Sequence, residues 1–313
     1  MKIVYAGTPE FAVPPLDSLI RAGLTPVAVI TQEDKPQGRK GILTPSPVKV
    51  FALEHGIDVL QPKKIRDEVE ALKALGGDLL VTCAYGQILT QEVLDVFPLG
   101  VWNIHAGLLP DYRGASPIQS CIVNGERETG VSIMKTELGL DTGAVLTVET
   151  LEIGAQTTYG ELSLRLSALA AEMLPNAIEK IASGNYELMP QAEREVKITR
   201  KIGKEHAKID FSRTAKEIVD FVRGYNPEPV AYTGVEGARL NVWTAAEAEL
   251  PEDSENAALG EVLSDVPKKG LIVRCRDGAV RLLEVQPAGG KRMRDSDFLN
   301  GKKAKKGQIL YVE

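Results

Sequence analysis

Asn103 and His105 lie two residues apart at the end of the apolar run VWNIH, and Asp141 follows in the turn-like sequence GLDTG. This set holds an amide donor, an imidazole and a carboxylate, but no neighbouring nucleophile. It suits acyl transfer to a substrate amine, in which Asn103 and a protonated His105 donate hydrogen bonds to the developing oxyanion. Asp141 would orient the imidazole and favour its charged form. A packing histidine and an ordinary Asp-Thr-Gly turn are the alternative explanation at this point.

The other histidines and the cysteines give no metal or disulfide pattern. His55 precedes Gly56 at the expected end of a helix, where a C-terminal cap explains it. His206 lies in a polar stretch with no evident partner, and the three histidines show no metal-binding spacing. The three cysteines are far apart and form no Cys-x-x-Cys pair, which argues against a disulfide framework or a thiolate zinc site and favours a reducing compartment.

The elements that must position Asn103 and His105 are found in the first half of the chain. Short β-rich runs alternate there with amphipathic segments, from KIVYA through PVAVIT and DLLVTCAYG to VWNIH. This order predicts βαβ units that build a mostly parallel sheet, an α/β fold. Ligands bind beyond the carboxyl ends of such strands, which is where Asn103 and His105 are expected.

The second half predicts a long helix and then a separate, smaller domain. Leu162, Leu166, Leu169 and Met173 lie at spacings of four, three and four, and form one apolar face of a helix over 158–183. Short β-rich runs at roughly 10-residue intervals near the C-terminus indicate a small β-barrel. We therefore expect a catalytic domain at 1–189, a linker at 190–207 and a C-terminal domain at 208–313.

Charge suggests nucleic-acid binding only at local patches. The chain has a net charge of −6 and a pI of about 5.4, so its surface as a whole would repel a polyanion. The run KRMRDSDFLNGKKAKK at 291–306 is strongly basic, and the long loop at 31–49 carries several basic residues among its glycines and prolines. That loop could grip a phosphate backbone, but solvated disorder is an equal alternative.

The first residues and the turn at Gly7 argue against several other classes. The chain opens directly on the apparent strand KIVYA and has no apolar run of about 18 residues, so we expect a cytoplasmic protein without a leader or a membrane span. Gly7 follows the first expected strand, but GTPEF lacks the later glycines of a dinucleotide fingerprint. A nicotinamide cofactor is therefore not expected.

The stretch VWNIHAGLLPDYRGASPIQ, with CAYGQIL before it and LGLDTGAVL after it, resembles the formyltransferase signature. The chain as a whole resembles the methionyl-tRNA formyltransferase family, from KIVYAGTPEFAVPPL through TPSPVK to YNPEPVAYT and GKKAKKGQ. The resemblance implies a Rossmann-like N-terminal domain and a C-terminal barrel similar to an OB-fold. It also implies transfer of a formyl group from 10-formyltetrahydrofolate to the methionyl amine of initiator tRNA, without a metal; we expect a monomer.

The resemblance also implies roles for individual residues. The catalytic asparagine, histidine and aspartate of the family fall on Asn103, His105 and Asp141. The folate-binding stretches fall on Tyr85, Gly86, Gln87, Ile88 and Leu89, and on Gly107, Leu108, Leu109 and Pro110. The contacts to tRNA fall on Lys35, Arg39 and Lys40 of the inserted loop, and on Lys302, Lys303, Lys305 and Lys306 of the basic run.

Three positions depart from the family pattern. Gly107 stands where the family usually has serine, so a hydroxyl contact to folate is absent while backbone contacts could survive. Phe211 lies near a usual tryptophan, and Glu228 stands where a bulky aromatic residue is frequent. These two departures concern the C-terminal domain and leave the chemistry unchanged.

Three other interpretations compete with this one. A glycinamide ribonucleotide or amino-sugar formyltransferase, or a deformylase-type hydrolase, would use the same catalytic set, but a small substrate needs neither the basic loop nor the basic tail. A non-catalytic RNA-binding protein would use the barrel alone and would not bind folate. A nicotinamide oxidoreductase lacks its glycine fingerprint.

Overall fold

The structure is a computed structural model, and it describes residues 1–38, 41–301 and 303–311. Arg39, Lys40 and Lys302, three of the predicted contacts to tRNA, lie outside the described residues. The chain divides into two compact units. The first comprises residues 1–117, 128–151 and 163–199, and the second comprises residues 118–127, 152–162 and 200–313.

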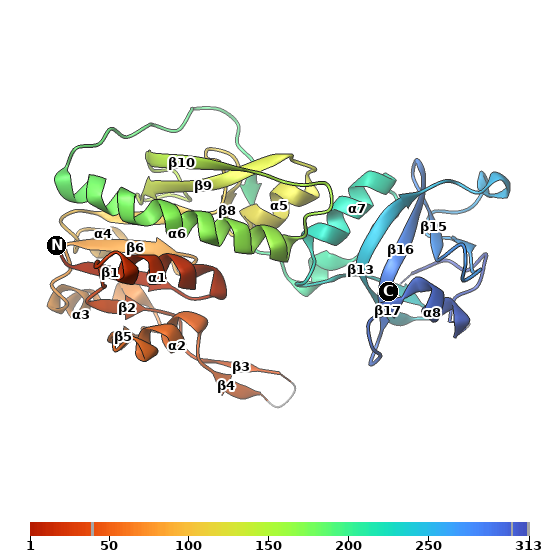
Figure 1. The fold of residues 1–313 in the computed structure, drawn as a ribbon, viewed down its shortest axis with the longest axis horizontal. Helices are drawn as coiled ribbons and strands as arrows, with labels where there is room; N and C mark the ends of the chain where they lie inside the picture. The colour runs from red at the N-terminus through yellow and green to blue at the C-terminus, as the bar shows by residue number, and fades with distance from the viewer. Residues whose placement is uncertain (39–40, 302, 312–313) are drawn as a thin grey trace. The chain divides into compact units, whose positions relative to one another are not determined.

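The first unit is built on a seven-stranded sheet (Figure 1). Its strand order is β10 (Val145–Glu152), β9 (Glu128–Lys135), β7 (Val101–His105), β6 (Leu79–Cys83), β1 (Ile3–Gly7), β2 (Ala28–Ile30), β5 (Val59–Leu60). The five strands from β7 to β5 pair in parallel, and β9 runs antiparallel to β7. Strands β1 and β6 are buried along their whole length because helices cover both faces of such a sheet. The predicted α/β fold with a mostly parallel sheet is confirmed.

The helices of this unit follow the connections between the strands. They are η1 (Glu10–Ala12), α1 (Val13–Arg21), α2 (Pro47–Glu54), η2 (Ile65–Asp67), α3 (Val69–Ala74), α4 (Gln91–Leu94) and, for most of its length, α6 (Tyr159–Ser183). The long helix predicted from the leucine spacing is confirmed: Leu162 and Leu166 are fully buried, and Leu169 is half-buried. Ser167 Oγ donates to the carbonyl of Phe11 at 2.7 Å, which joins α6 to η1. His55 caps α2 before Gly56, as predicted.

The basic loop at 31–49 contains regular structure. β3 (Lys35–Gln37) and β4 (Ile42–Thr44) pair as an antiparallel hairpin, which projects from the body of the first unit (Figure 1). α2 then begins at Pro47, and Ser46 caps it by accepting from the amide of Lys49 at 3.1 Å. The alternative of a solvated, irregular loop is therefore wrong for the described part of this segment.

The polar segment after α6 also makes specific contacts. β11 (Ile198–Thr199) pairs in parallel with β8 (Arg113–Gly114), and the division between the two units falls directly after Thr199. The 3-10 helix η3 (Lys204–Ala207) follows. His206, for which no partner was expected, accepts from the amide of Gly203 at 2.9 Å and lies 3.3 Å from the Glu205 carboxylate. That expectation was wrong because the contacts of His206 are local ones made by a turn that the sequence pattern did not reveal.

The second unit contains a six-stranded antiparallel sheet. Five strands follow the order β12 (Ala231–Val235), β13 (Ala238–Ala248), β16 (Gly278–Pro287), β15 (Ile272–Cys275), β14 (Val262–Ser264), and β17 (Met293–Arg294) pairs with β16. Besides η3, the helices are α5 (Pro117–Val123), α7 (Ala215–Gly224), η4 (Glu252–Ser254) and α8 (Asp295–Asn300). Alternate residues of β13, among them Leu240 and Val242, enter the core, as a period-2 strand requires. The predicted β-rich C-terminal domain is confirmed.

Candidate active site

Asn103 lies on the last strand of the parallel part of the sheet, with its amide orientation fixed by a neighbour. Thr82 is its register partner on β6, and Thr82 Oγ1 donates to Asn103 Oδ1 at 2.8 Å. Because Oδ1 is held in this way, the Nδ2 group of Asn103 points its two hydrogens elsewhere. No described residue accepts a hydrogen bond from that group. Asn103 is half-buried, so Nδ2 is a donor available to a bound molecule.

His105 follows two residues later on the same face of β7, and its ring is buried. Nε2 lies 3.1 Å from the carbonyl oxygen of Tyr112, and only a protonated nitrogen can bond a carbonyl, so Nε2 carries hydrogen. Nδ1 lies 3.6 Å from Asp141 Oδ2, an ion-pair distance but too long for a direct hydrogen bond. The side chains of His105 and Asp141 are therefore neighbours, as the proposed chemistry requires.

Burial lowers the pKa of His105 from its ordinary value of 6.5, while Asp141 and the Tyr112 carbonyl act in the opposite direction. Asp141 thus raises the pKa of His105, as expected, but desolvation of the ring has the larger effect on this pKa. At neutral pH the imidazole is consequently neutral, with hydrogen on Nε2 and a lone pair on Nδ1. A neutral His105 in the resting protein differs from the protonated form expected from the sequence.

Asp141 is held by both its side chain and its backbone. Its Oδ2 accepts from the amide of Gly114 at 2.7 Å, and its φ is +51°, a left-handed value that costs energy for a residue other than glycine. Gln191 Nε2 donates to the carbonyls of Asp141 and Gly143, each at 2.8 Å. Arg113 in turn donates to Gln191 Oε1 through Nε at 3.0 Å and a terminal nitrogen at 2.6 Å. This network stabilises the strained loop that carries the carboxylate.

The turn at 107–110 is fastened to the neighbouring strand β9. Ser132 is fully buried opposite His105, and its Oγ donates to the carbonyl of Gly107 at 2.7 Å and accepts from the amide of Leu109 at 3.3 Å. A Cβ atom at Gly107 would lie 3.0 Å from His105 Nε2. The absence of a side chain at this position therefore keeps the imidazole uncrowded.

The turn at 85–89 directs its side chains inward, except for one. Tyr85 is buried, and Gln87 donates to the carbonyl of Pro62 at 3.1 Å and accepts from the amide of Ile65 at 2.8 Å. Ile88, by contrast, is 90% exposed. No described residue pairs with the backbone amide of Ile88. The turn thus presents an apolar side chain and free backbone polar groups to a ligand.

The predicted basic contacts are exposed where the structure describes them. Lys35 lies in the hairpin of the first unit, and Lys303, Lys305 and Lys306 follow α8 in the second. Sequence reasoning missed Thr82, Ser132 and Gln191, and no local pattern marks them. Thr82 and Ser132 become relevant only through strand register, and Gln191 lies in a segment that reads as a polar linker.

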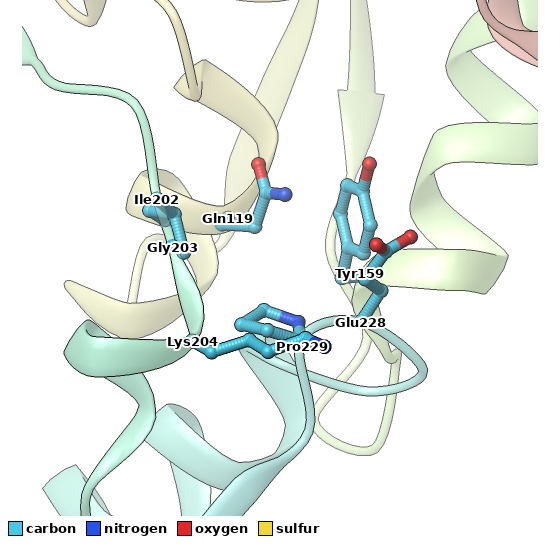
Figure 2. A pocket seen from close by; sticks show the side chains of 7 residues that line it. All are labelled: Gln119, Tyr159, Ile202, Gly203, Lys204, Glu228 and Pro229. Carbon is cyan, nitrogen blue, oxygen red and sulfur yellow. The ribbon is translucent and has the colours of Figure 1, made fainter. Parts of the chain in front are cut away.

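A separate small pocket of about 180 Å³ lies in the second unit (Figure 2). It is lined by Gln119, Tyr159, Ile202, Gly203, Lys204, Glu228 and Pro229. Figure 2 shows Gln119 and Tyr159 side by side above the loop that carries Glu228 and Pro229. None of the predicted catalytic or folate-binding residues contributes to it.

Among the residues that the structure describes, no three histidine, cysteine, aspartate or glutamate side chains come together as a metal site would require. Within the same residues, no helix combines the length and the apolar character needed to cross a bilayer. Cys83, Cys121 and Cys275 are buried free thiols.

Both parts of the chain match a known protein family. Residues 1–178 match the family described as formyl transferase, and residues 201–303 match its C-terminal domain. A methionyl-tRNA formyltransferase from Ruminiclostridium cellulolyticum is 43% identical over 312 residues, which cover 99% of each chain. The enzyme of the same name from Bacillus subtilis is 41% identical over 314 residues, covering 99% of this chain and 98% of the relative.

Solved structures share the fold at low identity. HypX from Aquifex aeolicus, in complex with tetrahydrofolic acid, matches with a TM-score of 0.62 and 18% identity over 100% of this chain and 51% of its own. WlaRD, a sugar 3N-formyl transferase in the presence of dTDP and 5-N-formyl-THF, matches with a TM-score of 0.63 and 21% identity over 90% of this chain and 96% of its own.

Proposed function

Because this chain belongs to the methionyl-tRNA formyltransferase family, we propose that it transfers the formyl group of 10-formyltetrahydrofolate to the α-amine of methionyl initiator tRNA. The product is N-formylmethionyl-tRNA for translation initiation. Identity of more than 40% over the whole length, including the C-terminal domain, supports an RNA substrate over a small amine. The observation on the site that carries this proposal is the grouping of His105 and Asp141, 3.6 Å apart, beside the free amide of Asn103.

Attack by the amine places charge on the formyl oxygen. As the new carbon–nitrogen bond forms, the carbonyl electron pair moves onto that oxygen, which then needs hydrogen-bond donors. Asn103 Nδ2 supplies one, in an orientation fixed by Thr82. His105, once charged, adds the positive charge of its ring, while its two N–H groups face the Tyr112 carbonyl and the Asp141 carboxylate. Donors fixed in advance stabilise such charge more effectively than water does, because they need no reorganisation.

The attacking nitrogen must lose a proton before the intermediate collapses. Neutral His105 accepts it at Nδ1, directly or through a water held by Asp141. The resulting imidazolium lies between the Asp141 carboxylate and the Tyr112 carbonyl, both of which favour the charged ring. Collapse then breaks the bond between the formyl carbon and N10 of the folate, and that nitrogen takes the proton.

The folate co-substrate fits the two turns that flank the catalytic residues. A pterin ring is flat, with apolar faces and a polar edge, and the 85–89 turn offers an exposed Ile88 together with free backbone groups. The 107–110 turn is fixed by Ser132, so its backbone can contribute in place of the missing hydroxyl at Gly107. We assign donor binding to Tyr85–Leu89 and Gly107–Pro110.

The RNA substrate is assigned to basic elements of both units. Lys35, with Arg39 and Lys40, would approach the acceptor end, and Lys303, Lys305 and Lys306, with Lys302, would contact the phosphate backbone. In this assignment residues 1–189 perform the chemistry, 190–207 connect, and 208–313 bind RNA. The protein would act as a monomer in the cytoplasm, where aminoacylated initiator tRNA is found.

The test is transfer of labelled formyl from 10-formyltetrahydrofolate to methionyl initiator tRNA. Methionyl elongator tRNA, an amino sugar and a small amine are run in parallel as acceptors. Formylation confined to the initiator supports the proposal. Transfer to a small acceptor alone would retain Asn103, His105 and Asp141 as the catalytic set but would reject the RNA substrate.

A further inference from the structure

Gln32 connects two elements to which separate substrates are assigned. It lies just after β2, at the root of the β3–β4 hairpin, and its side-chain amide is bonded at both ends. Nε2 donates to the carbonyl of Tyr85 at 2.9 Å, in the donor-binding turn. Oε1 accepts from Nζ of Lys35, the first residue of the hairpin. One side chain thus bridges Lys35 and Tyr85, which are 50 residues apart in the sequence.

Several side-chain contacts hold the two ends of the hairpin together. The hydroxyls of Thr31 and Ser46 are 2.7 Å apart across it, and Lys49 Nζ lies 2.8 Å from Asp34 Oδ2. The bond from Lys49 lowers the pKa of Asp34, so this carboxyl group is charged at neutral pH. Gln61 Nε2 donates to the backbone carbonyl of Gln32 at 2.8 Å and to Asp34 at 2.7 Å. The backbone from which the Gln32 side chain extends is therefore held by these contacts.

The donor-binding turn is shaped around the Gln32 side chain. A Cβ atom at Gly86 would displace Gln32 Nε2, from which it would lie 2.4 Å, and the φ of Gly86, +83°, is a left-handed value that favours glycine. Thr8 Oγ1 donates to the same Tyr85 carbonyl at 2.9 Å. The Tyr85 carbonyl would keep one partner without Gln32, but the contact to the hairpin would be lost.

The two bonds of the Gln32 amide strengthen each other. A cation on Oε1 polarises the amide and makes its N–H group a better donor. Lys35 has three ammonium hydrogens, of which Gln32 takes one, so two remain for phosphate oxygens. Phosphate binding that immobilises Lys35 therefore also stabilises the contact to Tyr85. Coupling of this kind is reciprocal between the two ligands.

We propose that Gln32 is a positioning residue that couples the RNA-binding hairpin to the formyl-donor turn, so that occupancy of either element favours ligand binding at the other. The inference rests on the proposed function, because that function assigns the two substrates to these elements. Gln32 touches neither reacting atom. Its effect is expected on the affinity of the donor and on the KM for both substrates, and much less on kcat.

The test is a mutant cycle of Gln32→Leu, Lys35→Met and the double variant, with binding of 5-formyltetrahydrofolate measured by calorimetry without RNA. In Gln32→Leu the donor turn loses this support and must be ordered on binding, at a cost comparable to one net hydrogen bond, so donor binding should be roughly three- to tenfold weaker. Lys35→Met should weaken it about threefold, although Lys35 is not part of the donor turn. The double variant should bind no more weakly than Gln32→Leu alone.

Two further variants sharpen the test. Gln32→Glu keeps an acceptor for Lys35 but places a carboxylate against the Tyr85 carbonyl, so it should bind the donor as weakly as Gln32→Leu while its KM for RNA rises less. Lys73→Met is the matched control, because the bond that Lys73 makes among the described residues is a local one to Glu70 on α3. It should bind the donor like the wild type.

Wild-type donor affinity in Lys35→Met, or independent losses that multiply in the double variant, would overturn the proposal. If Gln32→Leu fails to fold, the exposed Lys35→Met variant decides the question alone. The cycle uses no RNA, so it is independent of the substrate assay. A wild-type protein that fails to formylate methionyl-tRNA would reject the proposed function, whereas an active wild type with an additive cycle would reject only the coupling.

Discussion

The catalytic edge of the first sheet and the basic run after α8 differ in how firmly their side chains are held. Asn103, His105 and Asp141 each have a fixed partner in the protein. No described residue binds the ammonium groups of Lys305 and Lys306, which are exposed. Acyl transfer needs donors placed in advance, whereas phosphate attraction acts through charge over a Debye length of about 8 to 10 Å. Substitutions at the first region should therefore change kcat, and those at the second should change salt-dependent binding.

The largest effect is expected at Asn103. Asn103→Ala should lower kcat by roughly 10² to 10³, about 3 to 4 kcal/mol, because it removes a side-chain amide donor that no described residue occupies in the resting site. Single-turnover formylation of methionyl-tRNA measures it, with tRNA affinity unchanged. Thr82→Val provides a graded comparison, since it retains the amide but releases its orientation, and should lose less. Full activity of Asn103→Ala would reject the assignment.

A smaller loss of kcat is expected from Gln191→Leu. This change frees the carbonyls of Asp141 and Gly143 and the guanidinium of Arg113, so the carboxylate moves relative to His105. Misplacement by about 1 Å can cost up to roughly 10² in rate, and we expect about ten- to a hundredfold. KM values for both substrates should change little. Gln91→Leu, which removes an exposed bond to Asp95, is the control.

The pH dependence of the reaction tests the state of His105. Burial lowers its pKa, so the neutral ring that accepts a proton should persist below pH 6.5, and kcat/KM should fall only at more acidic pH. Asp141 raises the pKa of His105, so Asp141→Asn should lower it further and move the acid limb to lower pH while reducing kcat. A shift of that limb to higher pH would contradict the assigned pair.

Stability should depend on pH through the same group. The unfolded chain takes up a proton on His105 near pH 6.5, whereas the folded protein does so only at lower pH because burial lowers the pKa. The contribution of His105 to the free energy of unfolding is fully present above pH 6.5 and is lost as the pH falls through the pKa of His105 in the folded protein. His105→Gln should therefore lose stability less steeply on acidification in urea titrations. An identical slope in both proteins would show that His105 titrates normally.

The same contrast explains what could be predicted from the sequence. The parallel sheet follows from alternating apolar runs, and Asn103 and His105 from their position at the end of one of them. The surroundings of these residues could not be predicted. Thr82 and Ser132 lie next to them because of the strand register. Gln191 contacts Asp141 although the two are about 50 residues apart in the sequence. Periodicity reports which face of an element is buried, not which residue lies opposite.

The hairpin at β3–β4 was missed for a related reason. Its strands are short and exposed, with Ile42 and Leu43 at 64% and 66% exposure, so no buried alternation distinguishes them from an irregular loop. The bonds that define it, Thr31 to Ser46 and Asp34 to Lys49, join polar residues 15 positions apart. Such polar pairs depend on geometry that composition does not encode.

The smallest effect is expected in the basic run. Lys305→Ala with Lys306→Ala removes two charges, and should weaken tRNA binding roughly three- to tenfold at low salt and lower the slope of log K against log[salt] by about 2. Donor affinity and kcat at saturating tRNA should not change. Lys268→Ala with Lys269→Ala removes the same charge from an exposed turn of the same unit and is the matched control. Equal losses of tRNA affinity in both double variants would show that only net charge matters. A loss confined to Lys305 and Lys306 would identify a local phosphate contact. Such a contact needs the lysines at this position but does not need them to be rigidly held.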